Sequence, residues 1–108
     1  MTGFDDRLKG FEAKYSHDQE VQFRVTGRRN RLLGAWAAAK LGLSGDAAIA
    51  YAATVVKSDF EKPGDDDVIA KVLGDLKKKG VAVTEAAIRA ELDACHHEAK
   101  KQVAAELG

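Results

Sequence analysis

The sequence predicts an all-α protein, a small four-helix bundle preceded by a mobile amphipathic segment. Apolar residues recur at spacings of three and four along most of the chain, as they do on one face of a helix. Only one proline is present, and no run alternates apolar and polar residues as a half-buried strand does. The 108 residues are enough for one domain with a modest core. We therefore expect the bundle to span residues 16–108, with residues 1–15 outside it.

The first fifteen residues form an amphipathic segment of their own. Phe4, Leu8, Phe11 and Tyr15 are spaced four, three and four residues apart, so they share one face of a helix. This apolar stripe stops after Tyr15, and a new one begins at Val21. Because this stripe does not continue into the apolar stripe of the next helix, we expect the segment to bind a partner outside its own domain.

The energetics of this segment favour folding upon binding. Each large buried side chain gains roughly 1.5–3 kcal/mol, whereas fixing the backbone of each residue costs roughly 1–2 kcal/mol. Four such side chains set against a dozen ordered residues make a short helix marginal on its own, and Gly10 weakens it further. We expect residues 1–15 to be disordered in the free protein and helical when bound. The alternative is an N-terminal helix folded back onto its own bundle.

The next helix is predicted from Ser16 to about Leu41. Ser16 and Gln19 have the spacing of a capping box, and Gly42 can end the helix in a left-handed conformation. The predicted core face of this helix, with Leu33 beside it, consists of Val21, Val25, Leu32 and Trp36.

A second bundle helix follows a short loop. Ser44 or Asp46 is expected to cap it, and Pro63 and Gly64 terminate it after about Glu61. The apolar stripe predicted to face the core consists of Ile49, Ala52, Ala53, Val56 and Phe60.

Two further helices complete the predicted bundle. Acidic residues 65–67 suit the positive end of a helix dipole, residues 77–79 are lysines that suit its negative end, and Gly80 closes the helix. Thr84 is expected to cap the last helix. The inward residues are Val68, Ile69, Val72, Leu73 and Leu76, and then Ile88, Leu92, Cys95, Ala99 and Val103. Short loops favour antiparallel neighbours.

Composition and charge are ordinary for a soluble globular protein. The 17 basic and 17 acidic residues give a formal net charge of zero, so nothing favours nucleic acid as a partner. The single cysteine fits a reducing compartment, and we expect a cytoplasmic location. No apolar run is long enough for a membrane span, and the acidic N-terminus is not a signal peptide.

No residue pattern indicates catalysis, a metal or a cofactor. Asp65, Asp66 and Asp67 lack the spacing of a calcium loop and are read as a helix start. His96 and His97 point about 100° apart on a helix, so they do not converge on one ion. Cys95 lies on the apolar face and is expected to be a buried structural thiol. We therefore expect a protein that is not an enzyme.

The densest charged cluster is a group of arginines. Arg24, Arg28 and Arg31 are four and three residues apart and share a helix face, with Arg29 beside them. Such a patch could bind a phosphate or an acidic protein surface. We favour a solvated face paired with acidic residues of a neighbouring helix. The residues alone leave open a helical adaptor, or a nucleotide-binding regulatory module, for another cytosolic partner.

Several longer strings carry a resemblance to a known family. They are FDDR at 4–7, FEAKYSHDQE at 11–20, RRNRLLGAWAA at 28–38, GDAAIAYA at 45–52 and VVKSDFEKPGDDDV at 55–68. Together they resemble the zeta subunit of alpha-proteobacterial F-type ATP synthases. The similarity runs from Phe4 to about Leu92, and it rests on many unusual strings in a fixed order.

This resemblance implies an inhibitor of ATP hydrolysis. The family combines a four-helix bundle with an N-terminal extension that becomes helical in a catalytic interface between alpha and beta subunits. There it blocks rotation in the hydrolysis direction. The implied partners are the alpha, beta and gamma subunits of the synthase head. The resemblance also implies a free monomer and a peripheral position at the inner face of the bacterial membrane, held through the synthase and without direct membrane insertion.

The resemblance also implies which residues bind the partner. They are Phe4, Asp5, Asp6, Arg7, Leu8, Phe11, Glu12, Lys14 and Tyr15. The string Leu8-Lys9-Gly10 stands where more polar, more helix-favouring residues are expected, and Gly10 makes ordering of the segment costlier. Some family members are associated with nucleotide binding to the bundle, for which no residues are assigned in this chain.

Overall fold

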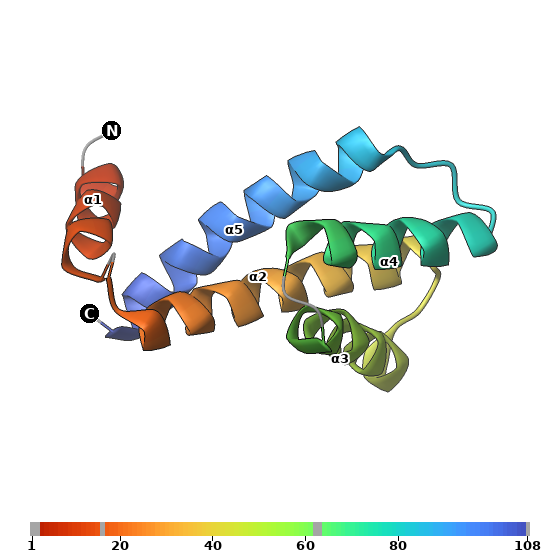
Figure 1. Cartoon of the computed structure of the whole chain (residues 1–108), viewed down its shortest axis with the longest axis horizontal. Coiled ribbons are helices and arrows are strands. Elements are labelled where there is room, and N and C mark those ends of the chain that lie inside the picture. The colour runs from red at the N-terminus through yellow and green to blue at the C-terminus, as the bar shows by residue number, and fades with distance from the viewer. Residues whose placement is uncertain (1–2, 16, 62–63, 108) are drawn as a thin grey trace.

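Five helices make up the part of the chain that the computed structural model describes (Figure 1). The structure describes residues 3–15, 17–61 and 64–107, and for residues 3–8, 60 and 61 the backbone alone. The helices are α1 (Gly3–Tyr15), α2 (Gln19–Lys40), α3 (Gly45–Glu61), α4 (Asp65–Lys78) and α5 (Glu85–Leu107). No strand occurs among these residues. The predicted all-α class, with four bundle helices after an N-terminal segment, is confirmed.

The bundle is organised around α2, which packs against both α3 and α5. The shorter α4 contacts α2, α3 and α5, and α1 stands apart at the end of the molecule where α2 begins and α5 ends (Figure 1). One buried cluster joins the four bundle helices, with Leu33, Val55, Leu76 and Ile88 fully enclosed. A second cluster lies between the start of α2 and the end of α5, and it includes one residue of α1.

The helix ends follow local sequence signals in most places. Gly42 and Gly80 adopt φ values of +80° and +82°, where a side chain would be strained, as expected for residues that end a helix. Thr84 caps α5, since its Oγ1 accepts a hydrogen bond from the Ala87 N–H at 3.1 Å. The expected start of α2 is wrong. Asp18 is its N-cap, with Oδ1 accepting from the Val21 N–H at 3.1 Å. Ser16 lies outside the described residues.

The inward face of α5 is confirmed, because all five predicted stripe residues are buried. In α4, four of the five predicted residues are buried, and Leu73 is partly so. In α2, Val21 and Val25 are buried as predicted, but Leu32 and Trp36 are less buried than the residues that directly follow them, Leu33 and Ala37. Leu33 is fully buried, whereas Leu32 and Trp36 pack against the clusters from partly buried positions.

The predicted inward stripe of α3 is correct at Ala52 and wrong at Ile49 and Ala53. Ala52 and Val55 face the core, whereas Ala53 is exposed, Val56 is half-buried and Ile49 keeps 69% of its surface exposed. The side chain of Phe60 lies outside the described residues. The cause is a very close approach of α2, because a Cβ placed on Gly34 would lie only 2.6 Å from the Ala52 Cα. This contact turns the small Ala52 toward α2 and leaves Ile49 outside.

No helix in the described ranges combines the length and the apolar content that a bilayer span requires.

Candidate functional site

Two aromatic side chains, of which Phe11 is the more buried, seat helix α1 on the bundle. Phe11 is only 7% exposed, and Tyr15 packs partly buried at the same place. The two rings lie 5.2 Å apart between centroids. The residues beneath them are Val21 and Val25 of α2, and Ala99, Val103 and Ala104 of α5. Phe11 therefore anchors α1 in the groove where α2 begins and α5 ends.

An ion pair holds the next residue of α1. Lys100 Nζ of α5 donates to Glu12 Oε1 at 2.9 Å. This hydrogen bond, together with the positive charge of Lys100, lowers the pKa of the Glu12 carboxyl below its ordinary value of 4.5. Both side chains keep contact with solvent, with exposed fractions of 53% for Glu12 and 25% for Lys100. The pair orients α1 and adds little stability.

The C-terminal end of α1 is joined to the start of α2 by backbone contacts. The Tyr15 carbonyl accepts hydrogen bonds from the Asp18 N–H and from Gln22 Nε2, each at 3.0 Å. Lys14 points outward, with its Nζ 5.4 Å from the centroid of the Tyr15 ring. The two hydrogen bonds tie the last residue of α1 to the start of α2.

Nine residues were predicted to bind a partner, and the structure places four of their side chains. Phe11 and Tyr15 face the bundle, Glu12 pairs with α5, and Lys14 is exposed. The other five lie in the helical backbone of α1. Their side chains are outside the described residues, and they are Phe4, Asp5, Asp6, Arg7 and Leu8.

A crevice opens beside the seat of α1. It has a volume of about 220 Å³ and is lined by Phe11, Glu12, Gln22, His96 and Lys100. His96 Nδ1 is enclosed and has no hydrogen-bond partner among the described residues. Burial first, and the charge of Lys100 second, lower the pKa of His96 below its ordinary value. Sequence reasoning missed Lys100 and His96 because no local signal links them to residue 12.

The predicted arginine patch is divided between two structural roles. Arg28 donates to Glu106 at 2.6 Å and to Gln102 at 2.9 Å, both on α5. This confirms, for Arg28, the expected pairing with a neighbouring helix. Arg24 and Arg31 are exposed. The patch as a whole is therefore not one convergent phosphate site.

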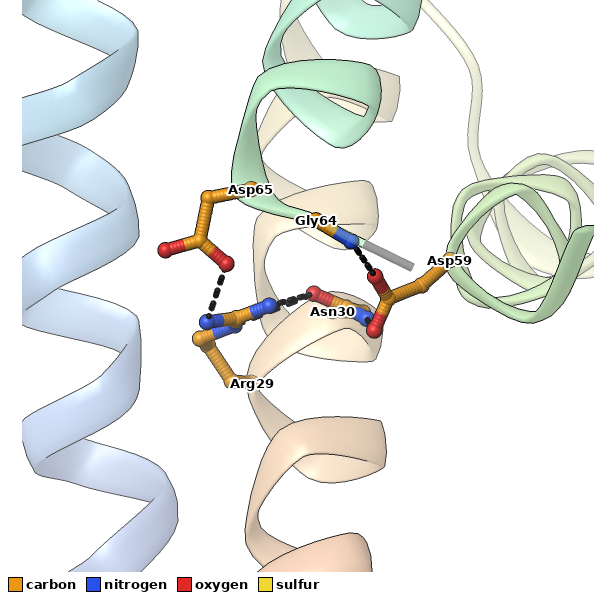
Figure 2. Close-up of polar contacts among 5 residues, drawn as sticks. All are labelled: Arg29, Asn30, Asp59, Gly64 and Asp65. Carbon is orange, nitrogen blue, oxygen red and sulfur yellow. Dashed lines mark hydrogen bonds and ion pairs between the residues drawn. The ribbon is translucent and has the colours of Figure 1, made fainter. Parts of the chain in front are cut away.

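Arg29 and Asn30 form a buried polar clamp, which the sequence did not reveal (Figure 2). Two guanidinium nitrogens of Arg29 donate to Asn30 Oδ1 at 3.0 and 3.1 Å, and the third donates to Asp65 Oδ1 at 3.1 Å. Asn30 Nδ2 in turn donates to Asp59 Oδ2 at 3.0 Å. Asp59 also accepts from the Gly64 N–H at 3.3 Å. The clamp joins α2 to the end of α3 and the start of α4.

The remaining candidates for chemistry have structural roles. Cys95 is buried, and burial, with a smaller effect of Glu91, raises the pKa of its thiol to about 12. Such a thiol is a poor nucleophile at neutral pH. Within the described residues, no three His, Cys, Asp or Glu side chains gather closely enough to hold a metal ion.

One comparison with known proteins identifies a family. The family described as ATPase inhibitor subunit zeta matches residues 1–102. No curated protein matches the chain. Among solved structures, one described as a solution NMR structure is 50% identical to the chain and superposes with a TM-score of 0.70. The match covers 79% of this chain and 96% of that one.

Proposed function

This chain belongs to the ATPase inhibitor subunit zeta family, and we propose that it inhibits ATP hydrolysis by placing residues 3–15 as a helix in an alpha/beta catalytic interface of its F-type ATP synthase. The observation that carries the proposal is the family match itself, because residues 1–102 include the whole N-terminal segment and most of the bundle. In this position the segment blocks rotation in the hydrolysis direction. The chain itself does not turn over ATP.

The way α1 is seated supports a segment that leaves the bundle. Its described attachment is the buried Phe11 ring, which is worth roughly 1.5–3 kcal/mol, the partly buried Tyr15 with the two hydrogen bonds to its carbonyl, and one exposed ion pair, which is worth roughly 0.2–1 kcal/mol. The stabilisation that these contacts provide is comparable to the cost of ordering a few backbone residues, at roughly 1–2 kcal/mol each. We propose that docked and released forms of α1 coexist, and that residues 1–15 are disordered when released.

The apolar side chains of α1 make contacts both when α1 is docked on the bundle and when it is bound to the partner. Phe11 and Tyr15 form the apolar face of α1, and here that face is turned toward α5. A helix that enters a partner's groove uses its apolar face. The segment must therefore give up its contacts with α5 before it binds the alpha, beta and gamma subunits. The bundle stays outside the catalytic interface, and the protein acts at the inner face of the membrane through the synthase.

The decisive experiment adds the full chain to the purified soluble ATPase head from its own source and follows hydrolysis under turnover conditions. The control is a variant that lacks residues 1–15. We expect the full chain to inhibit and the shortened chain to lose inhibition while it keeps cooperative thermal unfolding. Unchanged hydrolysis at saturating full-length protein would rule out the proposed function.

A further inference from the structure

The outer surface of α3 carries an apolar stripe that the bundle does not use. Ile49, Ala53 and Val56 are spaced four and three residues apart, as on the buried face of an amphipathic helix. In the structure, however, Ile49 is 69% exposed and Ala53 is exposed, because Ala52 and Val55 take the inward positions. The α3 helix is thus apolar on two faces, and only one of them belongs to the core.

This stripe forms one wall of a groove between α2 and α3. The groove has a volume of about 570 Å³. Its lining residues are Arg31 and Ala35 of α2, and Ala48, Ile49, Ala52, Ala53 and Val56 of α3. Ala52, one of the lining residues, also lies where α2 and α3 approach closely, because a Cβ placed on Gly34 would be only 2.6 Å from its Cα. Its size and apolar lining suit the side chains of a docked helix.

The charge of the groove indicates which kind of helix fits. Arg31 is the charged residue of the lining, and it is exposed. Lys57, also exposed, directly follows Val56 and lies one turn after Ala53. Among the described residues, no acidic side chain pairs with either cation. A helix with a carboxylate beside its apolar stripe would supply the missing charge and form a charge-assisted hydrogen bond with Arg31.

We propose that the groove between α2 and α3 binds an amphipathic helix with an acidic residue beside its apolar stripe, on a subunit of the ATP synthase head. This rests on the proposed function, which supplies the synthase as the partner. The groove then gives the bundle its own attachment, separate from α1. Two tethered contacts raise the overall affinity beyond that of either one alone.

The test compares matched variants of the full chain in binding to the purified synthase head. Ala53→Lys places a long cation on the apolar wall, and Thr54→Lys adds the same charge one residue away on an exposed position outside the lining. We expect Ala53→Lys to raise the dissociation constant by about tenfold or more, as loss of an interface contact does. Thr54→Lys should change it by less than about twofold.

A second pair of variants tests the charge and does not depend on the fold of Ala53→Lys. Arg31→Glu should weaken binding by at least about fivefold, whereas Arg24→Glu, exposed on the same helix, should have a smaller effect. If wild type binds and inhibits while Ala53→Lys and Arg31→Glu behave like their controls, the groove proposal is wrong and the proposed function stands. If wild type neither binds nor inhibits, the proposed function fails.

Sedimentation of the free protein tests whether a second copy of this chain occupies the groove. A dimer that Ala53→Lys abolishes would assign the groove to a second copy of this chain and overturn the proposal. A monomer at all concentrations agrees with it.

Discussion

Lys100 Nζ lies 2.9 Å from Glu12 Oε1 and so joins two residues that are 88 positions apart in the chain. The pair holds α1 against α5 next to Phe11, the one described residue of α1 that is buried. Glu12 is also one of the residues implied in partner binding. In the proposed mechanism, α1 must therefore leave this contact before Glu12 can bind the partner.

Removing the lysine should loosen α1. Lys100→Ala is expected to shift the balance between docked and released α1 toward release by about two- to fivefold, which corresponds to an exposed ion pair. NMR chemical shifts of the α1 amides would report this shift. The control is Lys78→Ala, because Lys78 is exposed at the end of α4. Inhibition should stay the same or strengthen slightly, and a clear loss would show that Lys100 supports the inhibitory state.

Docking of α1 should also weaken in acid. The pKa of Glu12 is lowered in the docked form, chiefly by the hydrogen bond from Lys100. The contribution of Glu12 is therefore fully present above its ordinary pKa of 4.5 and is lost as the pH falls through the lower docked value. An NMR titration of the Glu12 carboxyl would measure this pKa. In Lys100→Ala the pKa should return toward 4.5, and an unchanged low pKa would contradict the assigned cause.

The apolar face, rather than charge, should hold the segment on its partner. Phe11→Ala is expected to weaken inhibition by about 2 kcal/mol or more, roughly thirtyfold in the inhibition constant, because aromatic anchors dominate such interfaces. Lys9 is exposed, and Lys9→Ala should cost well under about 1 kcal/mol. Inhibition constants at two salt concentrations decide the point. If Lys9→Ala is the worse variant, and its defect disappears in high salt, charge holds the segment.

Gly10 is expected to limit the helicity of the segment. A Cβ at this position would meet nothing within 4 Å, so alanine fits the docked helix. Gly10→Ala should raise the helix content of the free protein and strengthen inhibition by at most about fivefold, or about 1 kcal/mol. Circular dichroism and the inhibition constant are the two measurements. Gly74→Ala, in equally open space on α4, should affect the bundle alone. Weaker inhibition by Gly10→Ala would mean that the partner presses against residue 10.

The buried clamp should matter for stability and not for inhibition. Asn30 is 1% exposed and accepts two hydrogen bonds from Arg29. Asn30→Ala leaves these buried donors unpaired, so the free energy of unfolding should fall by about 2–3 kcal/mol. Arg24→Ala, at an exposed position, should change it by less than about 0.5 kcal/mol. Denaturant unfolding measures both. A loss below about 0.5 kcal/mol for Asn30→Ala would show that water replaces the clamp.

Local signals in the sequence predicted much of the fold. Gly42 and Gly80 mark helix ends because glycine adopts a positive φ without strain. Thr84 marks a helix start because its side chain accepts a hydrogen bond from a backbone N–H three residues later. The α5 stripe was predicted correctly because its buried positions keep a helical period along the whole helix.

What the sequence did not predict depends on distant partners. Both faces of α3 are apolar, so periodicity could not decide between Ile49 and Val55, and the close approach of Gly34 to Ala52 did. The pairing of Glu12 with Lys100 likewise depends on how α5 returns to the start of the chain. At the start of α2, the spacing of Ser16 and Gln19 predicted Ser16 as the N-cap, whereas Asp18 is the N-cap in the structure.

The end of α5 has a practical consequence for anyone who attaches a label to this protein. A pocket is formed by Gly10, Phe11, Lys14 and Tyr15 of α1 together with Ala104, Ala105 and Leu107 of α5. A fluorescent reporter attached at Leu107 would therefore lie beside the segment that the assays follow and would compete with it for this pocket. The loop between α4 and α5 lies at the opposite end of the molecule (Figure 1), so a reporter at Ala82, which is exposed, would leave α1 undisturbed.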